Sequence, residues 1–264
     1  MYKCDEEIYI KNENDFYSIE SPDRIKKLFF CYECDFEMPN MDEFINIEEL
    51  SYNCTVSWEY ISKLRLPCIK KLYFTVYETR FSGKIEMPTL EKLKIRVEKF
   101  IDLTPLEMLI EMNEKRENID FSGFSNLKEL ELFRWCNIDL KSILVLSNLK
   151  SLTLSFCKLM DIKEISKIGT LEYLCLDNNE IENIESLIKL KKLKKLILSY
   201  NCIKDVTVLS YLNNLTEVDL YRNEIEDDSS LRGRKFTKLI ITKADKDEEM
   251  KKWRLENLSR RYKK

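Results

Sequence analysis

The sequence lacks the residues on which most enzyme chemistry depends. It contains no histidine among its 264 residues, so this chain supplies no imidazole for acid–base catalysis, for nucleophile pairs or for metal binding. It contains only four glycines (Gly83, Gly123, Gly169 and Gly233), and none of them belongs to a loop pattern that cradles phosphate. These two scarcities predict a protein that is not an enzyme and that requires no cofactor.

Cysteine is the residue type that could bind a metal, because thiolates are zinc ligands. The sequence has nine cysteines; Cys31 and Cys34 form its single Cys-x-x-Cys pair, which Cys4 and Cys54 could complete to a four-thiolate site. Such zinc sites usually show two pairs of this kind, and irregularly spaced cysteines are typical of free thiols in a reducing compartment. The start of the chain also lacks an apolar signal segment. We therefore expect no bound metal and an intracellular protein, cytoplasmic or nuclear.

Charge and hydropathy restrict the class of partner. The net charge is −3 with 34% charged residues, which does not favour nucleic acid or an anionic membrane as the main partner. No apolar run is long enough to span a membrane. The basic end of the chain could contact RNA or a ribosome, although basic residues at the end of a helix also complement its dipole. The basic residues of this end are Lys251, Lys252, Arg254, Arg260, Arg261, Lys263 and Lys264.

The dominant feature of the sequence is an internal repeat. Leu193–Ile203 follows the template L-x-x-L-x-L-x-x-N-x-I, and Leu215–Ile225 repeats this template 22 residues later. Successive matches are separated by 21 or 22 residues, except for one gap of 37. A fixed period of this length predicts stacked structural repeats that share one continuous core. The first apolar residues of the ten matches are Ile25, Ile47, Ile69, Leu90, Leu127, Leu149, Leu171, Leu193, Leu215 and Phe236.

Each repeat predicts a short strand and a return segment. Leu196 and Leu198 are expected to point inward from the strand, while Ile197 points outward. Asn201 ends the strand, and its amide can pair with backbone groups of the turn. The return segment shows near-helical apolar spacing at Ile203, Val206, Leu209 and Leu212. The asparagine position of the repeats is held by Cys34, Thr55, Cys136, Cys157, Asn179, Asn201 and Asn223, with a bulge expected before Cys34 and Cys136, whereas Tyr77 and Glu98 depart from the pattern.

These repeats resemble the leucine-rich repeat family, in the 22-residue class found in phosphatase-regulator-like proteins and in internalins. The resemblance covers roughly Ile25–Ala244 and is strongest over Leu149–Ile225. It implies an α/β fold: a leucine-rich-repeat solenoid of about ten repeats, with a curved parallel sheet on the concave face and short helices or 3-10 turns on the convex face. Members of this class mostly bind proteins, including phosphatase catalytic subunits, so the resemblance implies a non-enzymatic interaction scaffold.

The segments outside the regular repeats are expected to form caps and one insertion. The N-terminal cap is expected to contain a strand at the letters EIYI and a short helix that begins at Ser21-Pro22. The insertion is expected to contain an α-helix over about Pro105–Arg116, preceded by a capping box that begins at Thr104. The expected organisation is a cap over 1–24, repeats over 25–247 with the insertion near 101–120, and a basic C-terminal capping helix over 248–264.

The outward strand positions form the candidate binding surface. Leucine and isoleucine already fill the inward positions, so outward aromatic and arginine side chains are available to a partner, and these residue types dominate interface hot spots. Scattered surface aromatics are the alternative interpretation. The predicted partner-binding residues are Phe133, Arg134, Phe156, Tyr173, Asp177, Tyr200, Tyr221 and Arg222. The earlier repeats carry a candidate basic patch instead, formed by Lys71, Lys92, Lys94 and Arg96.

We therefore expect a scaffold, monomeric on its own, that binds a protein partner on its concave face and does not bind a membrane. One alternative is an RNA- or ribosome-associated leucine-rich repeat factor, whose binding would depend strongly on salt concentration. Another is a phosphatase-regulatory subunit. The sequence favours protein over nucleic acid as the partner, and it does not identify that protein.

Overall fold

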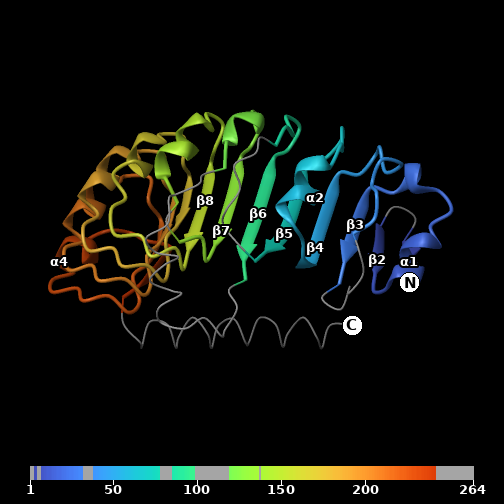
Figure 1. The fold of residues 1–264 in the computed structure, drawn as a ribbon. Coiled ribbons are helices and arrows are strands. Elements are labelled where there is room, and N and C mark those ends of the chain that lie inside the picture. Colours follow the sequence, from blue (N-terminus) through green and yellow to red (C-terminus); the bar gives the residue numbers. More distant parts are fainter. Residues whose placement is uncertain are drawn as a thin grey trace, which may run out of the picture. The chain divides into compact units, whose positions relative to one another are not determined.

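The computed structural model describes residues 3–4, 7–31, 38–77, 85–98, 119–136 and 138–241. The chain divides into two compact units, Met1–Cys157 and Lys158–Lys264. Each unit consists of mostly parallel strands, with short helices or 3-10 turns in many of the connections between them (Figure 1).

In the first unit, the described strands pair in the order in which they occur in the chain. β1 and β2 pair antiparallel, and each later neighbouring pair up to β7 and β8 is parallel. These strands are β1 (Lys3–Cys4), β2 (Glu7–Ile10), β3 (Lys27–Phe30), β4 (Glu49–Thr55), β5 (Lys71–Val76), β6 (Lys92–Val97), β7 (Glu129–Phe133) and β8 (Ser151–Ser155). The helices and 3-10 turns are α1 (Glu13–Tyr17), η1 (Pro22–Arg24), α2 (Trp58–Lys63), η2 (Phe121–Gly123) and η3 (Leu140–Val145).

The second unit continues the same alternation with shorter elements. Its described strands are β9 (Tyr173–Cys175), β10 (Lys195–Ile197), β11 (Glu217–Asp219) and β12 (Lys238–Ile240), and neighbouring strands are parallel. Its helical segments are η4 (Ile165–Lys167), η5 (Glu185–Lys189), η6 (Thr207–Tyr211) and α4 (Ser229–Arg232). Each helical segment of this unit is therefore only 3 to 5 residues long.

The strand register follows the sequence repeat. Lys195 lies opposite Glu217, which is 22 residues later and occupies the same template position. Lys92 lies opposite Glu129 although 37 residues separate them. The long gap therefore adds residues between two strands without shifting their pairing.

The burial pattern confirms the predicted inward positions. The first apolar residue of each of the first nine repeats is buried, and Phe236 in the tenth is half-buried. Leu196 and Leu198 are fully buried, while Ile197 between them is half-buried. The return residues Ile203, Val206, Leu209 and Leu212 are fully buried as well. Stacking neighbouring repeats thus buries a row of leucines that no single repeat could bury alone.

The asparagines of the later repeats form the predicted ladder of side-chain hydrogen bonds. Nδ2 of Asn201 donates to the carbonyl oxygens of Leu198 and Leu176, both at 2.9 Å, and Oδ1 of Asn201 accepts from the backbone N–H of Ile181 at 3.0 Å. Asn223 repeats this arrangement one repeat later. The thiol of Cys157 replaces it with weaker donation to the carbonyl oxygen of Ser155 at 3.4 Å. These bonds satisfy backbone groups that the strands leave unpaired at the turn.

Three earlier repeats depart from the ladder for visible reasons. The structure buries Trp135, not Cys136, at the asparagine position of the fifth repeat, so the bulge expected before Cys136 is wrong. The indole of Trp135 fills that volume by packing edge-on against Trp58 at a ring-centroid distance of 5.8 Å. In β5 and β6 the inward alternation continues to Val76 and Val97, so Tyr77 and Glu98 are exposed.

The N-terminal residues add two strands, β1 and β2, and two short helical segments, α1 and η1, to the first unit. The predicted strand at EIYI is β2, which pairs with β3, and the predicted turn begins with Pro22 in η1. The structure adds α1, which the sequence did not predict; the side chain of Asn12 caps it by accepting from the backbone N–H of Asp15 at 3.1 Å. Three expectations lie outside the described residues: the role of Cys34, the helix over Pro105–Arg116 and the C-terminal helix over 248–264.

Gly123 allows two backbone segments to approach closely, and this predicts a stability effect. A β-carbon at position 123 would overlap the carbonyl oxygen of Ile85, and the carbonyl oxygen of Gly123 accepts a hydrogen bond from Met87 N at 3.1 Å. We expect Gly123→Ala to cost about 1–3 kcal/mol in a urea melt, as overpacking does. Gly169→Ala is the control, because a β-carbon there meets nothing within 4 Å. Equal midpoints for the two variants would contradict the close approach.

Candidate partner-binding surface

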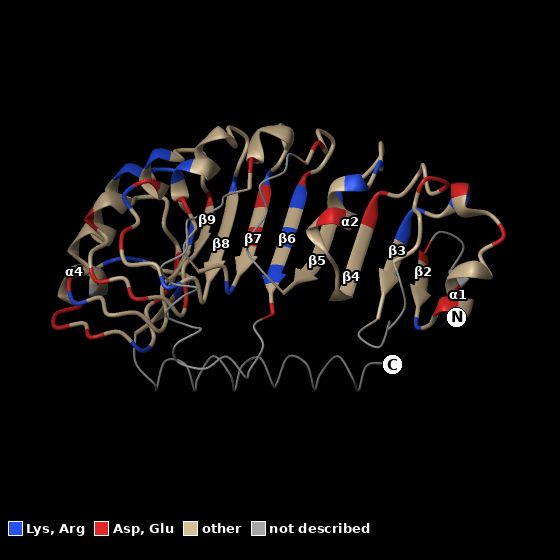
Figure 2. Cartoon of the chain, in the orientation of Figure 1, with Lys and Arg blue, Asp and Glu red and all other residues tan. Residues whose placement is uncertain are grey.

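The strands of the first unit present a row of charged residues on the side facing away from the leucine core, called the open face below. Blue and red residues on β3, β4, β6 and β7 mark this row (Figure 2). Three of the four residues of the predicted basic patch form ion pairs. Lys71 lies 3.2 Å from Glu49; Lys92 lies 2.8 Å from Glu129 and 2.9 Å from Glu131; and Lys94 lies 2.9 Å from Glu131. Carboxylates of neighbouring strands therefore compensate most of the positive charge of the patch.

The pKa directions agree with this compensation. Burial opposes the charge of Lys92, but hydrogen bonds to Glu129 and Glu131 outweigh it and raise the pKa of its ammonium group. Burial likewise opposes the charge of Glu131, and hydrogen bonds from Lys94 and Lys92 outweigh it and lower the pKa of its carboxyl. Lys92 and Glu131 are thus both charged at neutral pH and form an ion pair with each other.

Arg96 differs from the three lysines because an aromatic ring, not a carboxylate, lies beside it. Its guanidinium carbon is 4.6 Å from the ring centroid of Phe133, and no ion pair of Arg96 occurs among the described residues. Arg134 contacts the same ring at 5.4 Å, and Phe156 packs against it at 5.0 Å between centroids. The structure therefore brings Arg96, Phe133, Arg134 and Phe156 together at the β6–β8 end of the first unit.

The second unit carries a separate aromatic and arginine cluster on its open face. The rings of Tyr200 and Tyr221 meet edge-on with centroids 5.6 Å apart. Arg222 lies 5.4 Å from the ring of Tyr221, and its Nε donates to the Tyr221 hydroxyl at 3.2 Å. Tyr200 keeps 49% of its surface exposed. Accessible tyrosine and arginine side chains are of the types that dominate interface hot spots.

The two remaining predicted residues of this unit, Tyr173 and Asp177, contact neighbouring side chains of the same unit. The ammonium nitrogen of Lys195 lies 5.8 Å from the ring centroid of Tyr173. The carboxylate of Asp177 accepts from the Cys175 thiol at 3.0 Å and from Asn178 Nδ2 at 2.7 Å. Asp177 therefore holds the turn after β9 while it remains partly exposed.

A recurring backbone conformation links these clusters to the repeat. The residue before the asparagine position has a positive φ, between 55° and 60°, in five successive repeats: Arg134, Phe156, Asn178, Tyr200 and Arg222. The conformation is part of the repeat, because the backbone N–H of each of Arg134, Asn178 and Tyr200 donates to a backbone carbonyl oxygen of the following repeat. The acceptors are Ser155, Ser199 and Tyr221 respectively, at 2.8–2.9 Å. Left-handed backbone favours asparagine and glycine and is strained for bulky residues. Only Asn178 is of the favoured type, so the other four positions retain strained arginine and aromatic residues.

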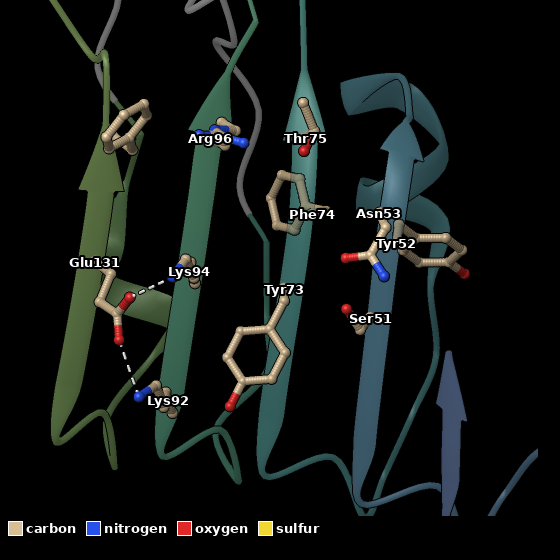
Figure 3. Close-up of a pocket in the computed structure, with 11 residues that line it drawn as sticks. Ser51, Tyr52, Asn53, Tyr73, Phe74, Thr75, Lys92, Lys94, Arg96 and Glu131 are labelled. Carbon is tan, nitrogen blue, oxygen red and sulfur yellow. Dashed lines mark ion pairs between the residues drawn. The ribbon is translucent and has the colours of Figure 1, made fainter. Parts of the chain in front are cut away.

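The open face of the first unit also contains a hollow that the sequence did not reveal. Its volume is about 580 Å³, and Ser51, Asn53 and Thr75 lie among the residues that line it. Tyr73, Lys92, Lys94, Arg96, Glu131 and Phe133 line it as well, together with Tyr52 and Phe74 (Figure 3). Ser51 lies between Phe29 and Tyr73 in the strand register. A small residue between two aromatic residues on neighbouring strands was the sequence signal that could have predicted the hollow.

The thiols and helices add two further observations. Cys54 is buried and Cys31 is half-buried, and neither forms a disulfide. No three His, Cys, Asp or Glu residues in the described ranges form a group that could hold a metal ion. Within the same ranges no helix is long and apolar enough to cross a membrane.

Comparisons with known proteins agree with the repeat geometry. A family model described as leucine-rich repeats, two copies, matches residues 191–233. Curated protein sequences give no match to the chain. Among solved structures, internalin C2 (inlC2) from Listeria monocytogenes str. 4b F2365 is similar with a TM-score of 0.49 and 23% identity over 66% of this chain and 72% of that one. Internalin inlF from the same strain gives a TM-score of 0.48 and 18% identity over 83% and 74%. TLR13, in its complex with ssRNA13, gives 0.53 and 21% over 81% of this chain and 30% of its own.

Residues 191–233 contain leucine-rich repeats, and the fold is a leucine-rich-repeat solenoid. The matched segment contains the repeats in which the asparagine ladder is complete. This confirms the predicted fold class. Proteins with this fold are typically protein-binding scaffolds and generally not enzymes.

Proposed function

We propose that this protein is a non-enzymatic scaffold that binds a protein partner through the open faces of its two units. The side chains assigned to binding are Phe133, Arg134 and Phe156 in the first unit and Tyr200, Tyr221 and Arg222 in the second. Tyr173 and Asp177 flank the second group. The single observation that carries the proposal is the retention of strained, exposed aromatic and arginine residues at the left-handed position of successive repeats.

This observation separates binding from folding. An exposed residue with φ near 60° destabilises the fold unless it is asparagine or glycine, by about 1 kcal/mol. Asn178 illustrates that the repeat accommodates the less strained choice. Phe156 and Tyr200 keep 41% and 49% of their surface exposed, so burial returns only part of that cost. Binding to another molecule accounts for the retention of such residues, because strained backbone positions cluster where proteins bind ligands.

The charge distribution supports a protein rather than a nucleic acid as the partner. Binding to nucleic acid requires unpaired cations that neutralise phosphates. On the first unit, Lys71, Lys92 and Lys94 are instead neutralised by Glu49, Glu129 and Glu131. The aromatic and arginine clusters provide the side chains that dominate protein interfaces.

Arg134→Asn tests the proposal at one residue, because binding and stability should change in opposite senses. We expect the free energy of unfolding to rise by about 1 kcal/mol, since asparagine tolerates left-handed backbone. We expect capture of the partner from an extract of the cells that express the protein to weaken. Urea melts measure the first effect, and quantitative mass spectrometry of captured proteins measures the second.

Asn178→Arg is the matched control for the stability effect. It introduces arginine at the same left-handed position two repeats later, in the second unit, and should lower the free energy of unfolding by a similar amount. A loss of stability in Arg134→Asn would show that Arg134 serves the fold. Unchanged capture in that variant would remove Arg134 from the proposed surface.

A further inference from the structure

The hollow on the open face of β4–β7 has an unbalanced set of charges. Among the described residues that line it, Lys92, Lys94 and Arg96 are cationic and Glu131 is the only carboxylate. Glu129, which lies outside the lining, neutralises Lys92 as well. With both glutamates counted, one positive charge remains. The described ion pairs therefore leave the guanidinium of Arg96 as the unmatched charge.

The surroundings of Arg96 orient it without neutralising it. The Phe133 ring, 4.6 Å from the guanidinium carbon, supports one face of the group by a cation–π contact, which leaves its N–H donors free for another acceptor. Glu98, two residues further along, accepts a hydrogen bond from the Thr55 hydroxyl at 3.3 Å. The planar fork of an arginine matches a carboxylate with two parallel hydrogen bonds.

The rest of the hollow offers neutral hydrogen-bond donors around a small floor. Ser51, Asn53 and Thr75 are short polar residues, and the labelled side chains in Figure 3 place Arg96 beside Thr75 on the neighbouring strand. Burial raises the pKa of Tyr73 to about 12, so its hydroxyl keeps its proton at neutral pH. The Lys94–Glu131 pair forms the wall beside Arg96. A volume of about 580 Å³ admits an extended side chain with its flanking backbone.

We propose that this hollow binds the carboxylate of an aspartate or glutamate side chain presented by the protein partner, with Arg96 as the residue that holds it. The inference rests on the proposed function, since it names the chemistry that the partner brings to one part of the same open face. The hollow is open to solvent, so a polypeptide can pass across it. This favours a side-chain carboxylate over a chain terminus.

The test uses peptides and does not depend on the cellular partner. A library of random peptides, about twelve residues long with amidated ends, is displayed and selected on the full-length protein. We expect the selected peptides to be enriched in Asp or Glu at one position beside an apolar residue. For one such peptide, changing the acidic residue to its amide should weaken binding to the wild-type protein at least about tenfold. The same change should have no effect on binding to Arg96→Gln.

Three controls make each outcome decisive. Lys192→Gln removes one positive charge from an exposed site outside the hollow and should preserve the tenfold difference. The same peptide with a free C-terminus and the internal amide tests the terminal carboxylate, and tighter binding of that form would overturn the choice of a side chain. The urea midpoint of Arg96→Gln, an exposed residue, should equal that of the wild type. Selection without acidic enrichment would overturn the inference. So would an equal loss of binding to Arg96→Gln when the acidic residue of the peptide is changed to its amide. If the aromatic clusters proved to have no role in capture of the cellular partner, the peptide result would still stand, so the two proposals fail separately.

Discussion

Leu198→Ala is expected to lower the free energy of unfolding by about 2–5 kcal/mol, the range for removing a large buried aliphatic side chain. Leu198 is fully buried in the second unit. Its carbonyl oxygen accepts from Asn201 Nδ2 and Asn223 Nδ2, both at 2.9 Å, and the substitution leaves these backbone bonds in place. The loss therefore measures packing between repeats. Urea melts followed by circular dichroism provide the measurement.

Ile197→Ala is the matched control for this prediction. Ile197 precedes Leu198 and is half-buried on the open face, and its side chain has the same number of carbon atoms. Because part of that side chain already faces water, its removal should cost clearly less than the removal of Leu198. A cost for Ile197→Ala equal to or above that of Leu198→Ala would mean that the two residues have exchanged faces.

The core was predictable because its positions depend only on spacing. Leu193, Leu196 and Leu198 recur at a fixed interval, and any chain that stacks at that interval must bury them together. The same reasoning placed Tyr200 on the outside, since inward positions were already assigned. It failed at the asparagine position of the fifth repeat. The template predicted Cys136 there, whereas the structure buries Trp135, whose indole packs against Trp58. The repeat spacing predicts which positions point inward, but which side chain fills a given volume of the core also depends on residues far away in the sequence.

The candidate surface was only partly predictable, because pairing between strands decides its properties. Lys92 read alone is a basic residue; its neutralisation requires Glu129 to lie on the next strand, across a gap of 37 residues in the sequence. The hollow required the relative sizes of side chains on several strands to be known at once. The left-handed conformations were signalled at Asn178 alone, and at Phe156 the residue type argued against one.

Replacing Phe156, Tyr200 and Tyr221 together with alanine is expected to abolish capture of the protein partner. Each exposed anchor at an interface contributes about 2 kcal/mol or more, so the loss of three weakens a micromolar complex by about four orders of magnitude, which is too weak for capture. The variant removes anchors from the open faces of both units, so a partner that uses either face loses contacts. The fold should persist, because Phe156 and Tyr200 are exposed and Tyr221 is half-buried. Their ring contacts are with other aromatic residues of the same unit, Phe156 with Phe133 and Tyr200 with Tyr221. Capture with quantitative mass spectrometry, alongside circular dichroism, measures both effects.

The control is a triple alanine variant of exposed apolar residues on the helical turns. Val145 lies at the end of η3, Ile188 in η5 and Tyr211 at the end of η6, and all three are exposed. This variant removes a similar amount of accessible apolar surface, so nonspecific hydrophobic capture would fall equally in both variants, and that outcome would contradict the proposal. Retained capture in the control with loss in the aromatic variant assigns binding to the open faces. Phe156→Ala alone and the Tyr200/Tyr221 double variant then show which unit carries it. Loss of the circular dichroism signal in the aromatic variant would instead show that these rings are needed for folding, and the assignment of the site would fail.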